Sequence, residues 1–307
     1  MSNIGFCENI AYMSTAPIAL FVYNRPEHTR KTVEALQKNL LAKESDIFIF
    51  SDGPKGKEMI DKIYEVRKYL KTITGFRLIN IIERKENLGL ANSIIGGVTE
   101  IINKFGKVVV LEDDLVTSPY FLEYMNEGLD LYKDDQKVSS IHGYIYPVKK
   151  HLPETFFLRG ADCWGWATWK RVWDLFEPDG KKLLKELEKQ NLIEKFNMDG
   201  SFNYSGMLER QIEGKNNSWA IRWHAEMFIL NKLTLYPGIS LVQNIGQDES
   251  GTHKGNSTRQ EVTLSERKIK IKNVPLKEDV KARKIIIQHL QSLKPKLFQK
   301  ILKKILS

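Results

Sequence analysis

The stretch that most constrains this chain is Val108–Leu115, which reads VVVLEDDL. Four apolar residues, Val108–Leu111, run directly into Glu112, Asp113 and Asp114. A short apolar run of this kind predicts a strand that is buried on both faces. Three adjacent carboxylates at the end of such a strand repel one another unless a cation neutralises them. Mg²⁺ or Mn²⁺ suits this position, because hard cations bind carboxylate oxygens together with substrate phosphates.

A simpler interpretation of the acidic triplet is a solvated turn, or a cap by Asp114 of the helix that follows. The preceding sequence favours a site instead, because three more buried-strand patterns alternate with helical ones. The predicted strands are Pro17–Tyr23, Asp46–Phe50 and Phe76–Ile82. The predicted helices are Thr29–Leu40, Met59–Leu70 and a third that the stretch Asn87–Ser93 leads into and that runs through Ile102.

Alternating strands and helices predict a parallel α/β sheet, whose ligands bind beyond the carboxyl ends of the strands. We therefore expect Asn24–Arg25, Asp52 and Glu112–Asp114 to meet at one edge. The chain has no GxGxxG after its first strand, no Walker loop and no nucleophile elbow. Dinucleotide binding, P-loop chemistry and serine hydrolysis therefore lose support.

Charge is distributed unevenly along the 307 residues. The net charge is +9, yet residues 281–307 carry eight Lys or Arg and no acid, so the other 280 residues carry only +1. The near-neutral body gives no support for nucleic-acid binding. The two cysteines form no disulfide framework, and the N-terminal residues lack the pattern of a signal peptide, which predicts a cytoplasmic protein.

The basic C-terminal residues predict an amphipathic helix over about 279–307, within an extension that begins at residue 258. Pro295 should kink or break this helix. A basic helix with an apolar face is typical of a membrane-surface element, which would hold the protein at the anionic inner face of a membrane. The alternative is a helix that packs its apolar face on the main domain.

Tryptophans cluster within residues 159–173, which contain four of the six in the chain. Trp166, Trp169 and Trp173 follow a helical spacing and predict a core-facing stripe. Trp164 and Trp166 flank Gly165, where packing in the core and a wall for a sugar ring are both open interpretations.

The chain resembles the GT-A class of nucleotide-sugar glycosyltransferases, and more narrowly the N-acetylglucosaminyltransferase I family. The resemblance covers about residues 16–257 and is most specific at Val109–Phe121, VVLEDDLVTSPYF, which matches the metal-binding strand of that family. It implies a Rossmann-like, mixed but mainly parallel sheet flanked by helices. It also implies a domain over 1–257, with a nucleotide half at about 16–142 and an acceptor half at about 143–257.

Carried over by position, the resemblance implies a role for each matched residue. Arg25 would contact the pyrophosphate or uridine of the donor, Asp52 the uracil, and Asp114 the Mn²⁺ or Mg²⁺ ion, with His253 as a second metal ligand. Ser93 occupies the position where the family has a histidine near the base of the donor nucleotide. The implied donor-binding residues are Tyr23, Arg25, Asp52, Ser93, Glu112, Asp113, Trp166 and Thr252.

One position departs from the family. Inverting members place their catalytic aspartate directly after a tryptophan that matches Trp219, and this chain has Ala220 there. Because inverting transfer needs a carboxylate to deprotonate the acceptor hydroxyl, Glu226 and Glu209 are the nearby candidates for the base.

The leading hypothesis is a metal-dependent, inverting glycosyltransferase. It would move a sugar from a nucleoside-diphosphate sugar, such as a UDP-sugar, to a glycan or lipid-linked glycan in bacterial surface-polysaccharide synthesis. A nucleotidyltransferase is one alternative, although the chain lacks a Gly-rich loop after the first strand. A non-catalytic glycan- or membrane-binding protein is another, and Ala220 is the feature that favours it.

Overall fold

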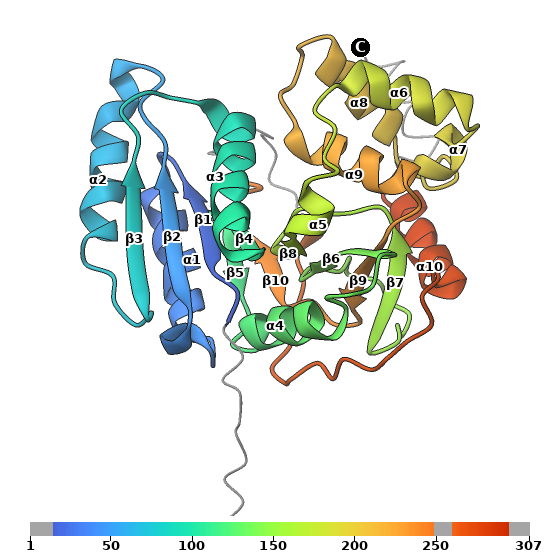
Figure 1. The fold of residues 1–307 in the computed structure, drawn as a ribbon, viewed down its shortest axis with the longest axis horizontal. Coiled ribbons are helices and arrows are strands. Elements are labelled where there is room, and N and C mark those ends of the chain that lie inside the picture. Colours follow the sequence, from blue (N-terminus) through green and yellow to red (C-terminus); the bar gives the residue numbers. More distant parts are fainter. Residues whose placement is uncertain (1–14, 249–259, 295–307) are drawn as a thin grey trace, which may run out of the picture.

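The structure is a computed structural model that describes residues 15–248 and 260–294. Its first half alternates strands and helices, as the sequence predicts (Figure 1). The strands of this half are β1 (Ile18–Val22), β2 (Asp46–Ser51), β3 (Leu78–Glu83) and β4 (Lys107–Glu112). The helices between them are α1 (Pro26–Gln37), α2 (Ile60–Leu70) and α3 (Gly89–Phe105).

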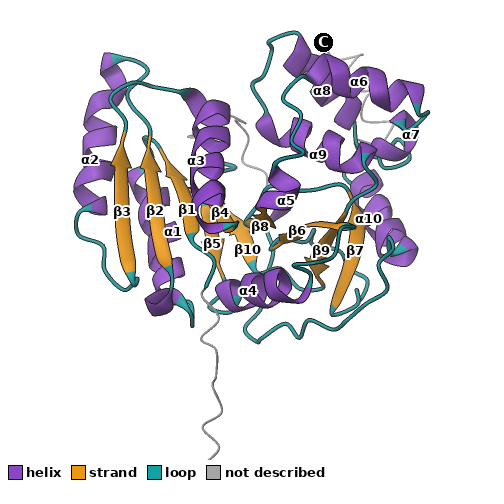
Figure 2. Cartoon of the chain, viewed as in Figure 1, coloured by secondary structure: helices purple, strands orange, loops and turns teal. Residues whose placement is uncertain are grey.

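The second half continues the same sheet and adds a group of helices beside it (Figures 1 and 2). Its strands are β5 (Leu115–Thr117), β6 (Val138–His142), β7 (Thr155–Arg159), β8 (Trp166–Trp169), β9 (Leu233–Pro237) and β10 (Val242–Asn244). Its helices are α4 (Phe121–Leu131), α5 (Lys170–Trp173), α6 (Gly180–Lys189), α7 (Ile193–Phe196), α8 (Tyr204–Ile212), α9 (Trp219–Ile229) and α10 (Val280–Ser292).

Eight strands form one sheet in the order β3-β2-β1-β4-β8-β6-β9-β7. The pairs β1–β2, β1–β4, β2–β3 and β6–β9 are parallel, while β8 runs antiparallel to both β4 and β6. Strand β7 closes the far edge antiparallel to β9, and β5 and β10 form a separate two-stranded sheet. The predicted fold class, a mixed but mainly parallel sheet flanked by helices, is therefore confirmed.

The nucleotide half is held together by apolar strands between two helical layers. Every residue of β1 and β2 is buried, and the rings of Phe21 and Phe50 stack at 5.0 Å. Helix α3 lies directly on these rings at Gly97, where an added Cβ would come within 2.6 Å of Phe21 Cε1. A glycine at this position thus sets the close approach of helix to sheet.

The tryptophans Trp166, Trp169 and Trp173 are buried in the core, as predicted, but their predicted helical stripe is wrong, because Trp166–Trp169 is strand β8. Residues three apart in a strand point to opposite faces of the sheet. Trp166 packs on Trp219 and Trp223 of α9, with ring centroids 5.4 and 5.6 Å away. Trp169 instead donates from Nε1 to the carbonyl oxygen of Leu129 in α4, at 3.0 Å. The two rings therefore anchor helices on both faces of the sheet.

Helix α10 is part of the core rather than a free membrane-surface element. It buries Ala282, Ile286 and Leu290 in a cluster with β7 and its surroundings. The helix ends at Ser292, three residues before Pro295, and residues 295–307 lie outside the described part of the chain. For the described half of the predicted amphipathic helix, the alternative of packing on the main domain is correct.

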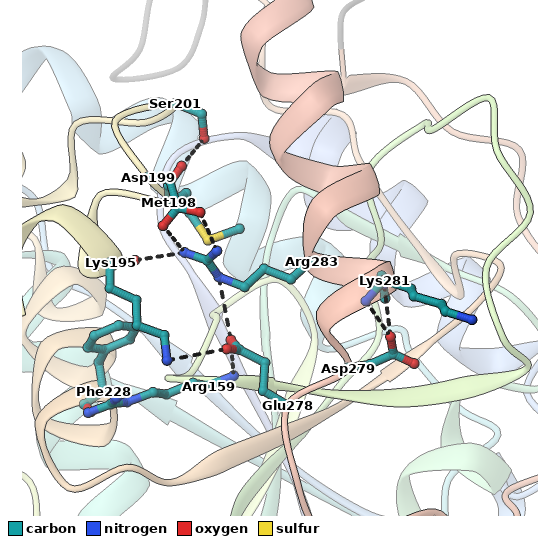
Figure 3. A network of polar contacts seen from close by, with 11 residues as sticks. Arg159, Lys195, Met198, Asp199, Ser201, Phe228, Glu278, Asp279, Lys281 and Arg283 are labelled. Carbon is teal, nitrogen blue, oxygen red and sulfur yellow. Dashed lines mark hydrogen bonds and ion pairs between the residues drawn. The ribbon is translucent and has the colours of Figure 1, made fainter.

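Polar contacts fix the start of α10 (Figure 3). Asp279 caps the helix, its Oδ1 accepting from the backbone nitrogens of Lys281 and Ala282 at 2.9 Å. Arg283 forms a two-pronged pair with Asp199, at 2.6 and 2.7 Å, and donates to the carbonyl oxygen of Lys195. The described part of the C-terminal extension is thus tied to the helices of the second half. No helix among the described residues has the length and apolarity that crossing a bilayer requires.

Candidate active site

The carboxyl ends of three parallel strands bring the predicted site residues together. In the β1–β4 pair, Phe21 lies opposite Glu112, and in the β1–β2 pair, Val22 lies opposite Ser51. The residues that follow these three strands therefore emerge at one edge of the sheet. Tyr23–Arg25, Asp52 and Glu112–Asp114 meet there, as the strand pattern predicts.

Arg25 is the cation that faces the acidic triplet. Its Nη2 donates to Asp113 Oδ1 at 2.5 Å and to Asp114 Oδ2 at 2.8 Å. The backbone nitrogen of Tyr23 lies 3.4 Å from Asp113 Oδ2. The side chain of Asp113 is 7% exposed and that of Asp114 is 15% exposed, so the pair is largely shielded from solvent.

Backbone contacts hold the acidic turn in place. Thr32 in α1 donates from Oγ1 to the carbonyl oxygen of Asp113 at 2.8 Å. The backbone nitrogen of Ile245 donates to the carbonyl oxygen of Asp114, also at 2.8 Å. The turn after β10 lies against the carboxylate, because a Cβ on Gly246 would fall 2.0 Å from Asp114 Oδ2. Backbone from the second half of the chain therefore covers one side of the acids.

The site carries more negative charge than Arg25 can balance. Burial, and then the charges of Asp114 and Asp113, raise the pKa of Glu112 to about 8. Burial also raises the pKa of Asp113 to about 6, although Arg25 opposes this rise. Even with Glu112 protonated, the two aspartates face one guanidinium, so a further cation is electrostatically favoured at this edge.

The donor set fits a hard divalent cation that also binds substrate phosphates. Within the described residues, no three His, Cys, Asp or Glu side chains form a complete ligand set. Mg²⁺ and Mn²⁺ commonly use only one or two protein carboxylates and complete their shell with phosphate and water. Asp114 and Asp113 supply such oxygens. The predicted ligand His253 and its neighbour Thr252 lie outside the described residues.

Asp52 anchors the start of α3. Its carboxylate accepts from the backbone nitrogens of Gly53, Leu88 and Gly89, at 3.1, 3.0 and 3.0 Å. Negative charge at a helix N-terminus is favourable, which explains an acid at this strand end. The predicted contact of Asp52 with uracil stays a prediction, and any base would have to share this occupied carboxylate.

Ser93 lies nearby in α3, with 4% of its surface exposed. Its Oγ accepts from Arg84 Nη1 at 2.7 Å. The serine thus holds a basic side chain that follows β3. Its predicted role in donor binding remains a prediction.

Trp166 does not face this edge. It is 0% exposed and lies within the tryptophan core, so its ring cannot contact a donor sugar. The partly exposed neighbour Trp164 has a ring at the surface instead. The prediction for Trp166 is therefore corrected: strand alternation turned it inward.

The two predicted bases also lie elsewhere. Glu226 lines a surface groove between α6 and α9 with Glu177 and Lys182. Burial, and then the charge of Glu177, raise the pKa of Glu226, while Lys182 opposes this rise. Glu209 is exposed on α8. Neither charge is among those that shift the pKa of Glu112 or Asp113. The structure gives both glutamates positions outside the acidic edge.

Sequence reasoning missed a second polar cluster on the acceptor half. Asp162 lies between β7 and β8, and Tyr236 of β9 donates to its Oδ2 at 2.7 Å. The loop that carries Asp162 has no periodic pattern, and its neighbours come from β6, α8, α9 and β9. The one local signal in the sequence was the position of Asp162 within residues 159–173, a stretch rich in glycine and tryptophan.

Comparisons with known proteins give a partial likeness. No protein-family model and no curated protein matches the chain. One similar structure is the mannosyltransferase PcManGT from Pyrobaculum calidifontis in complex with GDP-Man and Mn²⁺, at 12% identity and TM-score 0.32, covering 43% of this chain and 36% of that chain. TarS from S. aureus is similar at 12% identity and TM-score 0.32, covering 47% of this chain and 24% of that chain.

A third similar structure is a protein from Desulfovibrio desulfuricans G20 described as a nucleotide-diphospho-sugar transferase. It is 14% identical with TM-score 0.34, and the match covers 54% of this chain and 69% of that chain. The chain thus spans well under half of the first two structures that it matches.

Proposed function

We propose that this chain is a glycosyltransferase that transfers a sugar from a nucleoside-diphosphate sugar, with Mn²⁺ or Mg²⁺ as cofactor. The observation that carries the proposal is the acidic triplet Glu112–Asp114, clamped by Arg25 at the carboxyl edge of a parallel sheet. Open α/β sheets bind nucleotides at this edge. A site with two hard-oxygen ligands and a guanidinium suits a diphosphate bridged by a metal ion.

The chemistry follows from the charges at this edge. Asp114, with Asp113, would hold the cation, which when bound supplies positive charge to the departing nucleoside diphosphate. Arg25 already donates hydrogen bonds to the same two carboxylates through Nη2. Its other N–H groups can donate to a phosphate oxygen of the donor. The bond from the anomeric carbon to the phosphate oxygen breaks as an acceptor hydroxyl attacks from the opposite face, giving inversion.

For the acceptor, we propose a glycan or a lipid-linked glycan at the inner face of a bacterial membrane, in surface-polysaccharide synthesis. In this proposal, the basic residues after Lys294 bind the anionic lipids of that membrane. The described half of the helix is committed to the core and does not support this part of the proposal.

Thermal shift with a panel of nucleotide sugars tests the function. We expect UDP-glucose, UDP-N-acetylglucosamine or GDP-mannose, added with Mn²⁺, to raise the melting temperature of the wild-type protein. A ligand that binds only the folded state adds about 2.7 kcal/mol at a concentration of 100 Kd. Asp114→Ala should abolish both this shift and slow donor hydrolysis while the ligand-free protein stays folded.

Asp61→Ala, on the exposed face of α2, serves as the matched control and should behave as wild type. Absence of a shift with every donor in the wild-type protein would contradict the transferase proposal. A shift and a hydrolysis rate that survive excess EDTA, or survive Asp114→Ala, would remove the metal from it.

A further inference from the structure

Asp162 lies in a loop that reaches the same edge as the acidic triplet. The loop ends at Trp166, which pairs with Val110 on one side and with His142 on the other. It therefore enters β8 between the carboxyl ends of β4 and β6. Burial, and then the charges of Glu112, Asp162 and Asp114, raise the pKa of the thiol of Cys163, the residue next to Asp162.

Three elements hold this loop in position. The hydroxyl of Tyr236, which is 4% exposed in β9, donates to Asp162 Oδ2 at 2.7 Å. His224 of α9 lies with Nδ1 2.6 Å from the carbonyl oxygen of Ala161. The backbone nitrogen of Trp164 donates to His142 Nε2 at 3.2 Å. The position of Asp162 is thus fixed by buried groups before any ligand arrives.

No lysine or arginine of the described residues pairs with Asp162. Some other partly buried acids of this chain do have such a partner, for example Asp130 with Lys107 at 3.2 Å. The charge of Asp162 acts instead on phenols, imidazoles and a thiol; these are His142, Tyr144, Tyr146, Cys163, Tyr204, His224 and Tyr236. A half-buried carboxylate that is held by a hydrogen bond to one oxygen and has no cationic partner among the described residues is suited to accept a proton from a bound hydroxyl.

Aromatic rings surround the carboxylate on the acceptor half. The rings of Tyr144 and Trp164 lie edge to face at 4.7 Å, and Tyr146 adjoins Tyr144 at 5.6 Å. Trp164, Tyr146 and Tyr204 remain partly exposed. Such rings offer an apolar face for the C–H groups of a sugar and polar tips for its hydroxyls.

We propose that Asp162 is the general base of the transfer reaction and that the partly exposed aromatic residues around it, Tyr146, Trp164 and Tyr204, bind the acceptor sugar. This inference rests on the proposed function. The acceptor hydroxyl oxygen bonds to the anomeric carbon while the bond from that carbon to the phosphate oxygen breaks. The hydroxyl proton passes to Asp162, and the electron pair of the broken bond leaves with the nucleoside diphosphate.

The test uses Asp162→Asn in the full chain, because asparagine keeps the shape of the side chain and an oxygen for Tyr236. Water is the acceptor in the assay, so no acceptor has to be known. We expect the release of nucleoside diphosphate from the best donor of the panel to fall by at least about 100-fold, the usual contribution of a general base. The thermal shift given by the same donor with Mn²⁺ should stay within twofold of that of the wild type.

Asp61→Asn is the matched control for the change from acid to amide and should keep the wild-type rate. Hydrolysis at the wild-type rate by Asp162→Asn, with donor binding intact, overturns the inference and leaves the proposed function standing. A wild-type protein that neither binds nor hydrolyses any donor overturns the proposed function, and the inference with it. Loss of hydrolysis together with loss of the thermal shift also overturns it, since Asp162 would then serve donor binding.

Discussion

At the scale of single residues, the backbone of one glycine lies close against a carboxylate of the candidate site. Gly246 follows β10, far along the chain from Asp114, yet an added Cβ would lie 2.0 Å from Asp114 Oδ2 and 2.9 Å from Arg25 Nη1. Only hydrogen fits in this space. The glycine therefore lets the second half of the chain form one wall of the acidic edge.

Gly246→Ala should displace Asp114 and Arg25 and reduce the release of nucleoside diphosphate at least tenfold. Overpacking of this kind costs about 1–3 kcal/mol, which denaturant unfolding would detect. Gly96→Ala is the matched control, because Gly96 lies in the interior of α3 with open space around it. It should raise the stability by about 0.5–1 kcal/mol. Equal activity in the two variants would contradict this prediction and show that the turn after β10 can move to accommodate a methyl group without displacing Asp114.

Glu112 is a second residue whose surroundings have a measurable consequence. Its pKa of about 8 in the fold lies above the usual value of 4.5, so the folded protein binds more protons than the unfolded chain between these limits. Stability falls with rising pH wherever the folded state binds more protons. The contribution of Glu112 is thus complete below pH 4.5 and is lost as the pH rises through 8.

Glu112→Gln should therefore flatten the decline of melting temperature between pH 5 and pH 8, measured in EDTA, because glutamine stays neutral throughout. Asp113, whose pKa is raised to about 6, would leave a smaller decline at the acidic end of this range. Parallel curves for the variant and the wild type would show that the carboxyl of Glu112 is not held protonated by its surroundings.

At the scale of elements, α10 shows how one helix can satisfy two interpretations of its sequence. Its apolar spacing and basic residues match a membrane-surface helix, but the structure uses the apolar face for packing. Ile286 is 0% exposed, whereas Val280 on the first turn is 73% exposed. Amphipathicity alone does not reveal whether the partner is lipid or protein.

Ile286→Ala should lower the free energy of unfolding by about 2–5 kcal/mol, the usual cost of a large-to-small change in a core. Val280→Ala, on the same helix, should change it by no more than about 0.5 kcal/mol. Guanidinium unfolding followed by circular dichroism measures both. An Ile286→Ala variant as stable as the wild type would indicate that α10 leaves the body of the protein in solution.

Elements were also where the sequence was most informative. The four strands of the first half and the helices between them follow from hydrophobic runs and turn residues, which act locally. The tryptophans were misassigned because spacings of three and four fit a helix, while here a strand (Trp166–Trp169) runs directly into a short helix (Lys170–Trp173). Strand β7 and helix α9 were not predicted, because they are stabilised by contacts with the sheet, β7 by pairing with β9 and α9 by packing on Trp166, and not by a local sequence pattern.

At the scale of the whole molecule, the sheet passes through both halves without a break. Strand β8 lies between β4 and β6, and a common core contains residues of both halves. The donor-side edge could be predicted because parallel strands place their ends together. The acceptor side could not, since the neighbours of Asp162 are brought to it only by the order β4-β8-β6-β9. The misplaced bases, Glu226 and Glu209, reflect the same missing information.

The distribution of tryptophan in this fold gives the protein its own optical reporter. All six indoles lie between residues 164 and 223, and five of them are buried. Trp164 alone is partly open to solvent, one residue from Cys163 and two from Asp162. A water-soluble quencher such as acrylamide would act mainly on its fluorescence. The emission of the unmodified chain can therefore signal when the space around Asp162 becomes occupied, without any attached dye.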